Sequence, residues 1–322
     1  MQVFGRDLVE THCAGSEWPN FLGRVQPGER FVVETERGNR VNGPLAVAGI
    51  RAGDAIAVHV ESIEMVPPYE SPNGGPFFEG LGDPVPLTYL DGRFCYPQGT
   101  VLPAKPSVGN VAVLPEPTEA VLAMSRRDLG PSGLRHRGWG WRGLVNDPRG
   151  KHCHQDCASL SAGAAIHLRA QVDQAGLCLG DVHGYIGQGE MAFAGIEVAA
   201  RVTLRVDRSA GWYVDWPLIE TEDEIMVFCS DTNLLSGSTD EQYVDVVRRA
   251  YWEMRKVVAH KIGGSIRDAN PIVAAALDVR NCALYGLANF VQKEGKRPDE
   301  RDQDIAVVGV LAKCLFAATG GE

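Results

Sequence analysis

Two clusters of side chains that can bind metals or transfer protons stand out between residues 150 and 206. The first contains His152, His154 and Asp156, and the second contains Asp181, His183 and Glu190. Imidazole and carboxylate groups are ligands of catalytic zinc, and the same groups act as general acids and bases. These residue types therefore indicate a candidate site for metal binding or acid–base chemistry.

The spacing within each cluster is the one that places side chains on one face of an extended chain. If residues 152–156 are extended, both imidazoles and the Asp156 carboxylate project together. The same geometry places Asp181 and His183 on one face. An apolar alternating run at residues 164–172 separates the two clusters. A loop follows this run, so two adjacent strand ends would bring the polar faces together.

The elements that must position these clusters are mainly strands. Alternating or short apolar runs bounded by turn residues are typical of strands. The predicted strands are Arg30–Glu36, Ala55–Ile63, residues 107–114, Glu197–Val206, Trp212–Ile219 and Glu224–Cys229. A long Pro- and Gly-rich loop is expected at residues 64–106, and long loops are often functional. The first three quarters of the chain are therefore predicted to be β-rich.

Helical spacing of apolar residues appears mainly near the C-terminus. Asp240–His260 has acidic residues at its start and basic ones later, which matches the helix dipole. Asn270–Val291 is predicted as a second helix with Pro271 near its first turn and an interruption near Asp278–Asn281, and a short helix is expected at Glu119–Arg127. Asp304–Phe316 fits a strand or a helix equally. The prediction is a mainly β fold with α elements (α+β) in one domain, with a β-rich part at 1–235 and a helical part at 236–322.

Composition limits the classes of function. The chain has 322 residues, 44% hydrophobic and 22% charged, and a formal net charge of −10. A general nucleic-acid or membrane-surface role is not expected, because binding phosphates needs a basic face. Neither a spanning helix nor a secretory signal is read from the sequence. The eight cysteines are dispersed, which is typical of free thiols in a reducing cytoplasm.

Several short motifs, taken in order, resemble the acetamidase/formamidase family. The matching blocks are NRVNGP (39–44), AGIRAGD (48–54), PSVGNVAVLP (106–115), KHCHQD (151–156), GDVHGYIGQGE (180–190), PLIETED (217–223) and AALDVR (275–280). The resemblance implies hydrolysis of a small amide to a carboxylate and ammonia or an amine. It also implies a β-sandwich body with C-terminal helices, and a homo-oligomer that is a dimer or larger.

The resemblance also carries over individual residues. Those that match are Asp156, Gly180, Asp181, His183, Gly187, Gly189 and Glu190. Those that depart are His152, Cys153 and His154, which replace Gly, Gly and Asn, and Ile186 and Gln188, which replace Gln and Asp. The departures indicate a divergent member that acts on a different amide, such as an N-formyl or carbamoyl compound.

Amide hydrolysis needs an activated water, stabilisation of the oxyanion and a proton for the departing nitrogen. The first hypothesis is a metal-dependent amidohydrolase with a divalent ion, zinc being expected. The proposed ligands are His152, His154, Asp156, Asp181 and His183. The proposed catalytic residues are Glu190, acting as general base and proton shuttle, with His183 and Asp181. Predicted substrate-binding residues are Gly187 and Gly189 with Trp139 and Trp141 from an Arg- and Trp-rich loop.

Two alternatives remain open from the sequence. In the first, Cys153, Cys157 or Cys178 is the nucleophile of a metal-free amidase, activated by a neighbouring histidine. In the second, the chain binds a small ligand or a metal without turnover, because Ile186 and Gln188 depart from the family. Glu190 could also orient another ligand rather than act as a base. His59, His167 and His260 are interpreted as structural.

Overall fold

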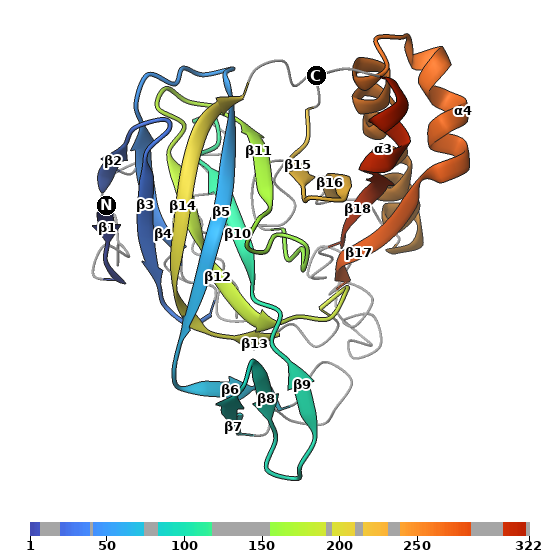
Figure 1. The fold of residues 1–322 in the computed structure, drawn as a ribbon. Helices are drawn as coiled ribbons and strands as arrows, with labels where there is room; N and C mark the ends of the chain where they lie inside the picture. Colours follow the sequence, from blue (N-terminus) through green and yellow to red (C-terminus); the bar gives the residue numbers. More distant parts are fainter. Residues whose placement is uncertain are drawn as a thin grey trace, which may run out of the picture.

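The computed structural model describes residues 1–6, 20–38, 41–73, 83–117, 155–190, 195–209, 215–230, 239–284 and 305–319. Strands in three sheets make up the largest share of these residues, with two helices near the C-terminus (Figure 1). The prediction of a mainly β fold with C-terminal helices is confirmed. The predicted helix at Glu119–Arg127 lies outside the described residues. No described helix is long and apolar enough to cross a membrane.

A nine-stranded sheet forms the largest layer. Its order is β1-β3-β14-β5-β11-β15-β16-β18-β17. The strands are β1 (Gln2–Phe4), β3 (Arg30–Thr35), β14 (Ala199–Ser209), β5 (Ala55–Val66), β11 (Ala165–Arg169), β15 (Leu218–Glu220), β16 (Glu224–Ser230), β18 (Ile305–Ala312) and β17 (Asp278–Leu284). Strand β14 shows the expected alternation, because Ala200, Val202 and Leu204 are buried while Arg201 and Arg205 are only partly buried.

A second sheet packs against the first and carries the candidate site. Its order is β10-β12-β4-β2, and β13 pairs with β12. The strands are β2 (Gly23–Val25), β4 (Val41–Val47), β10 (Ser107–Val113), β12 (Leu177–Tyr185) and β13 (Ile196–Glu197). Side chains from both sheets, such as Val58 and Leu204 from the first and Val111 and Leu179 from the second, share one core. Because both sheets bury one face in this core, the arrangement is a sandwich.

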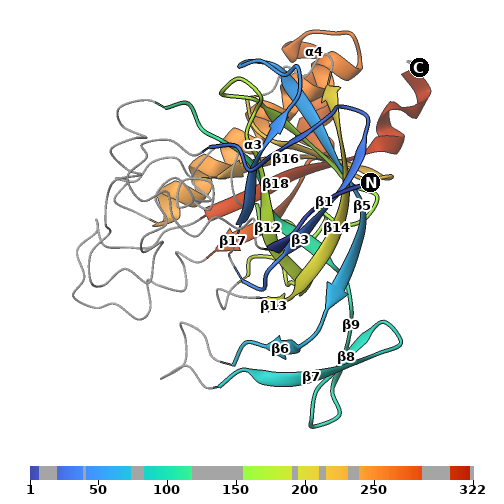
Figure 2. The ribbon, with the colours of Figure 1, turned by 90° about the vertical axis from the view of Figure 1, so that its left-hand side faces the viewer.

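A small third sheet projects from one end of the sandwich (Figures 1 and 2). It contains β6 (Tyr69–Ser71), β7 (Val85–Leu90), β8 (Arg93–Cys95) and β9 (Val101–Pro103). This sheet lies within the region that was predicted as a long loop, so that prediction was wrong in part. The buried ring of Phe94 fixes its base, since it occupies the space beside Gly184 of β12.

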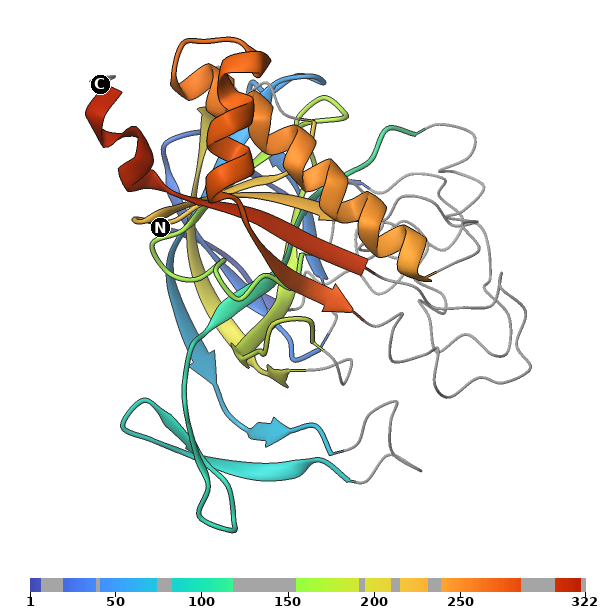
Figure 3. The same cartoon turned by 90° about the vertical axis from the view of Figure 1, so that its right-hand side faces the viewer.

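Two helices cover the far end of the nine-stranded sheet (Figure 3). Helix α3 (Thr239–Lys261) buries Val246, Ala250 and Met254 against β16 and β18 in a second core. These residues recur every four positions, which is the spacing of one helix face. Helix α4 (Ile266–Ala276) packs on α3, and a short 3₁₀ helix (Lys313–Thr319) follows β18.

The predicted helix at Asn270–Val291 was wrong at both ends. The capping box of Ser265 and Asp268 starts α4 four residues earlier, so Pro271 lies inside the helix. Residues after Ala276 turn into β17, which pairs with β18 along its length. Long-range strand pairing therefore overrides the local helical pattern. The segment 304–316 divides between both of its predicted states, with β18 followed by the 3₁₀ helix.

Candidate active site

Strand β12 brings two of the predicted residues together. Asp181 and His183 lie on the same face, and Asp181 Oδ2 is 3.9 Å from His183 Nε2. Both side chains are buried, with 1% and 0% of their surfaces exposed. Asp181 has a left-handed backbone, with a φ of +55°, so the regular alternation of a strand, on which the prediction relied, does not explain how the two side chains approach one another.

Asp156 reaches the same place without the extended backbone that its cluster predicted. Its φ is +47°, which is left-handed, so the geometry expected for residues 152–156 was wrong at this residue. The backbone N–H groups of Gln155 and Asp156 both donate to Gly109 O, at 2.8 and 3.0 Å. The side-chain amide of Gln155 also donates to and accepts from the backbone of Val111, both at 2.9 Å. This segment is therefore fixed to the edge of β10.

Gly109 leaves the space in which the two aspartates meet. A Cβ at this position would lie 2.8 Å from Asp156 Oδ1 and 2.8 Å from Asp181 Oδ2. Both contacts are shorter than real Cβ atoms show. The absence of a side chain on β10 therefore lets carboxylates from two distant segments approach one another.

Glu190 is a third acidic residue that lies beside the imidazole of His183. Glu190 Oε1 accepts a hydrogen bond from the Gly195 N–H at 3.0 Å and lies 3.2 Å from His183 Nε2. The turn before it contains Gly189, whose φ is +91°, and the Glu190 N–H donates to Gly187 O. Gly187 and Gly189 therefore shape the turn that presents Glu190, whatever contact they make with a substrate.

Glu197 is a site residue that the sequence analysis missed. It pairs in register with His183 from the neighbouring strand β13. Burial, and next the charge of Asp181, raise the pKa of Glu197 to about 8. One sequence signal could have identified it: Glu197 follows Gly195 in a short segment just after the block 180–190. The pairing of β13 with β12, which the sequence does not show, is what brings it to the site.

The acidic residues of the site lie on unusual backbone. Of the six non-glycine residues with positive φ among those described, three are Asp156, Asp181 and Glu190. A left-handed backbone at such residues costs roughly 1–3 kcal/mol each and persists only where its surroundings impose it. Strain of this kind is concentrated at functional sites, so the backbone supports the same location as the side chains.

The electrostatic potential in the site is strongly negative. Burial alone would lower the pKa of His183, but the charges of Asp181 and Glu190 raise it to about 10. Asp156 acts in the same direction. The Nδ1 of this imidazole is buried without a hydrogen-bond partner among the described residues. Four acidic side chains surround the ring, and this environment favours binding of a cation beside it.

The donor atoms fit a divalent metal ion. Asp156, His183 and Glu190 offer ligand atoms that all lie within 4.8 Å of one another. The same is true of Asp181, His183 and Glu197. Carboxylate oxygens and imidazole nitrogens are ligands of zinc, and carboxylates also suit manganese. The predicted ligands His152 and His154 and the predicted substrate-binding Trp139 and Trp141 lie outside the described residues.

The cysteines considered as nucleophiles lie in different surroundings. Cys178 is in β12 but belongs to an apolar cluster with Val41, Ala112 and Leu114, and its thiol donates to Gly176 O at 3.6 Å. Cys157 follows Asp156, and its hydrogen bond with Cys282 lowers the pKa of the Cys157 thiol. Both side chains are buried, and Cys153 lies outside the described residues.

Two histidines interpreted as structural lie on the nine-stranded sheet and have partners on β14 of the same sheet. His59 Nε2 lies 3.1 Å from Asp207 Oδ2. His167 Nδ1 lies 2.9 Å from Ser209 Oγ, and burial lowers its pKa to about 4. His260 lies in the last turn of α3. These contacts are compatible with a structural role.

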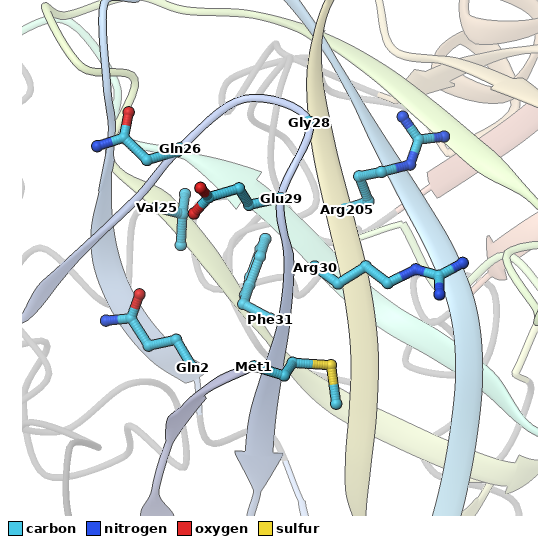
Figure 4. A pocket seen from close by; sticks show the side chains of 9 residues that line it. All are labelled: Met1, Gln2, Val25, Gln26, Gly28, Glu29, Arg30, Phe31 and Arg205. Atoms are coloured by element: carbon cyan, nitrogen blue, oxygen red, sulfur yellow. The ribbon is translucent and has the colours of Figure 1, made fainter.

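A cavity of about 560 Å³ lies elsewhere, beside β1, β3 and β14 (Figure 4). Its lining consists of Met1, Gln2, Val25, Gln26, Gly28, Glu29, Arg30, Phe31 and Arg205. Figure 4 shows Arg30 and Arg205 pointing away from Glu29, and both guanidinium groups pair with Glu61. None of the site carboxylates lines this cavity, so its size alone gives it no catalytic role.

Comparison with known proteins agrees with this location. Residues 100–251 match the Acetamidase/Formamidase family, a range that includes Gly109, Asp156, Asp181, His183 and Glu190. The predicted resemblance to this family is confirmed over that range. The match supports the predicted class of enzyme, an amidohydrolase of small amides. No curated protein sequence matches the chain.

Solved structures show the same fold at low identity. An acetamidase from Yersinia enterocolitica is 20% identical, with a TM-score of 0.71, and the match covers 98% of this chain and 93% of that chain. A predicted acetamidase/formamidase from Thermoanaerobacter tengcongensis is 19% identical, with a TM-score of 0.73 and coverage of 99% and 98%. An acetamidase from Bacillus halodurans is 19% identical, with a TM-score of 0.70 and coverage of 99% and 100%.

Replacing Gly109 by alanine tests the convergence of the aspartates. The added methyl group would meet the backbone oxygen of Asp181 at 2.7 Å as well as both carboxylates. Gly109→Ala is therefore expected to displace the aspartates and to lower zinc or manganese affinity about 10- to 100-fold, as loss of supporting contacts does. Calorimetric titration of metal-free protein measures this. Gly309→Ala is the control for metal affinity, because Gly309 lies on β18 of the nine-stranded sheet and a Cβ there meets no atom closer than 3.2 Å. Equal affinity in both variants would contradict the arrangement.

The two raised pKa values predict how the metal-free protein responds to pH. The carboxyl of Glu197 and the imidazole of His183 both bind protons more tightly in the folded chain than at their usual pKa values of 4.5 and 6.5. The free energy of unfolding therefore falls as the pH rises from about 4.5 to 8 through Glu197, and from 6.5 to about 10 through His183. Melting temperatures of chelated protein measure this fall.

Glu197→Gln is the matched variant for this experiment. It keeps the size of the side chain but cannot ionise, so its melting temperature is expected to fall less than that of the wild type between pH 6 and pH 8. Parallel curves for the two proteins would show that Glu197 does not titrate in this range.

Proposed function

We propose that this protein is a metal-dependent hydrolase of a small linear amide, giving a carboxylate and ammonia or an amine. Formamide, acetamide and N-formyl or carbamoyl compounds are the substrates considered. The observation that carries the proposal is the convergence of Asp156, Asp181, Glu190 and Glu197 on His183 in a buried site. The family match over residues 100–251 supports the reaction class.

The described residues divide into ligands and a base. Asp156, Asp181 and His183 would hold the ion, with Glu197 beside Asp181. When bound, a divalent metal lowers the pKa of water to about 7 and polarises a carbonyl group. Glu190 takes a proton from the attacking water and gives it to the departing nitrogen. The Gly195 N–H holds the carboxylate of Glu190 in the orientation that these transfers need.

The metal, the assembly and the cellular location belong to the same proposal. One imidazole with carboxylates suits manganese as well as zinc, and added ligands from His152 and His154 would favour zinc. We propose a homo-oligomer in the cytoplasm that binds neither nucleic acid nor membranes. The free cysteines among the described residues support a reducing compartment.

Substitution of the acidic residues tests the function directly. Asp181→Asn is expected to remove both bound metal and ammonia release from acetamide or formamide. Glu190→Gln is expected to retain metal but to lower kcat about 100- to 10,000-fold, the usual effect of losing a general base. Asp207→Asn is the matched control, since Asp207 pairs with His59 on the nine-stranded sheet, which does not carry the site. Metal analysis and an ammonia assay are the measurements.

Two results would contradict this assignment. Purified protein without bound metal, whose ammonia release is unaffected by a chelator, would remove the metal. Tight binding of one small amide without turnover under any metal would instead favour the non-catalytic alternative.

The thiol alternative makes a different prediction. If the metal route holds, Cys157→Ser and Cys178→Ser retain kcat/KM within several-fold, because Cys178 packs in an apolar cluster and Cys157 bonds to Cys282. Iodoacetamide labelling followed by peptide mass analysis is the measurement. Complete loss of activity with stoichiometric labelling of one cysteine would select the thiol nucleophile, Cys153 included.

A further inference from the structure

Ser107 is a buried hydroxyl beside the candidate site, inside the block 106–115, and the proposed mechanism gives it no role. It lies on β10 directly opposite His183 of β12. Side chains of directly opposed residues in antiparallel strands lie on the same face, with Cβ atoms about 4.5–5.5 Å apart. Only 1% of Ser107 is exposed, and its Oγ has no hydrogen-bond partner among the described residues.

Unsatisfied buried polar atoms are rare in folded proteins and each calls for a physical reason. Here Ser107 Oγ and His183 Nδ1 are both unsatisfied on neighbouring strands. A ligand between or beside them would supply the missing partners. The coincidence of two such atoms with the acidic cluster favours a ligand over an accident of packing.

The kind of ligand follows from the donors available. With a cation bound, the acidic side chains are ionised and only accept hydrogen bonds, so they can receive an amide NH₂ group but cannot bind its carbonyl oxygen. A serine hydroxyl can donate. Ser107 and His183 are the two members of this group of described side chains that can do so at neutral pH without a carboxyl proton.

The backbone holds Ser107 in place from two sides. It pairs with His183 of β12, and it forms an isolated bridge with Ser161. The N–H of the next residue, Val108, donates to Leu160 O at 2.9 Å. Fixed donors stabilise a developing oxyanion because they need little reorganisation during the reaction.

We propose that Ser107 binds the carbonyl oxygen of the substrate amide and stabilises the negative charge that develops on it. This inference rests on the proposed amide hydrolysis and adds a residue in contact with the substrate. Ser107 donates a hydrogen bond and forms no covalent bond, so it neither gains nor loses a proton over the reaction.

Ser107→Ala separates this role from a structural one, because a substrate contact predicts a lower kcat without a loss of stability. Removing an unsatisfied buried hydroxyl leaves the metal-free protein as stable as the wild type or more stable. Removing one oxyanion donor lowers kcat about 100- to 1,000-fold, with a much smaller change in KM. Thermal melting and steady-state ammonia release from acetamide and formamide measure the two effects.

Ser230 provides the matched control. Its Oγ is also buried without a hydrogen-bond partner among the described residues, but it lies on β16 of the other sheet. Ser230→Ala is expected to have the same effect on the melting temperature as Ser107→Ala and to keep kcat within twofold. Arg249 donates a hydrogen bond to the backbone carbonyl oxygen of Ser230, and this contact does not depend on the serine side chain.

Each outcome decides between the possibilities. Wild-type kcat in Ser107→Ala, or a loss of kcat accompanied by a lower melting temperature, overturns the role of Ser107 and leaves the proposed function intact. A wild-type protein that neither binds nor hydrolyses acetamide and formamide under zinc or manganese overturns both. Lowered kcat with an unchanged or raised melting temperature, seen for Ser107 but not for Ser230, supports the inference.

Discussion

Mutual repulsion among four clustered carboxyl groups is the constraint on which the candidate site depends. Asp156, Asp181 and Glu190 are buried around a single imidazole, and the partly buried Glu197 lies beside them, so water screens their charges poorly. Like charges at this distance destabilise the folded chain unless protons or a cation compensate them. The raised pKa values of His183 and Glu197 are the response of the metal-free protein, which takes up protons where a divalent ion would bind.

The surrounding fold holds these groups together against that repulsion. Gly109 removes the side chain that would separate two aspartates, and Gln155 fixes the segment before Asp156 to the edge of β10. The sandwich core beneath β10 and β12 then prevents either strand from moving away. Close-packed cores transmit such strain rather than relax it. The site is therefore assembled by the sheet, and its acidic residues contribute destabilisation that the core offsets.

Local periodicity predicted those parts of the fold and site that depend on one segment. Helix α3 follows from its apolar stripe, whereas the left-handed backbone of Asp181 departs from the strand period on which its predicted placement relied. Asp156 departs from the predicted extended geometry because its backbone is left-handed. Its hydrogen bond to Gly109 O favours this conformation, and no local sequence pattern indicates it. Glu197 was missed for a related reason, since only the pairing of two strands places it beside the imidazole. Segment 278–284 became a strand through its long-range partner β18.

The departures from the family motifs acquire a physical meaning in this arrangement. Ile186, one of the departures expected from the resemblance, is 6% exposed. Its Cβ and the imidazole of His183 both approach the position that a Cβ on Gly195 would occupy. An isoleucine at this position offers no hydrogen bond, so any discrimination between substrates there would come from shape.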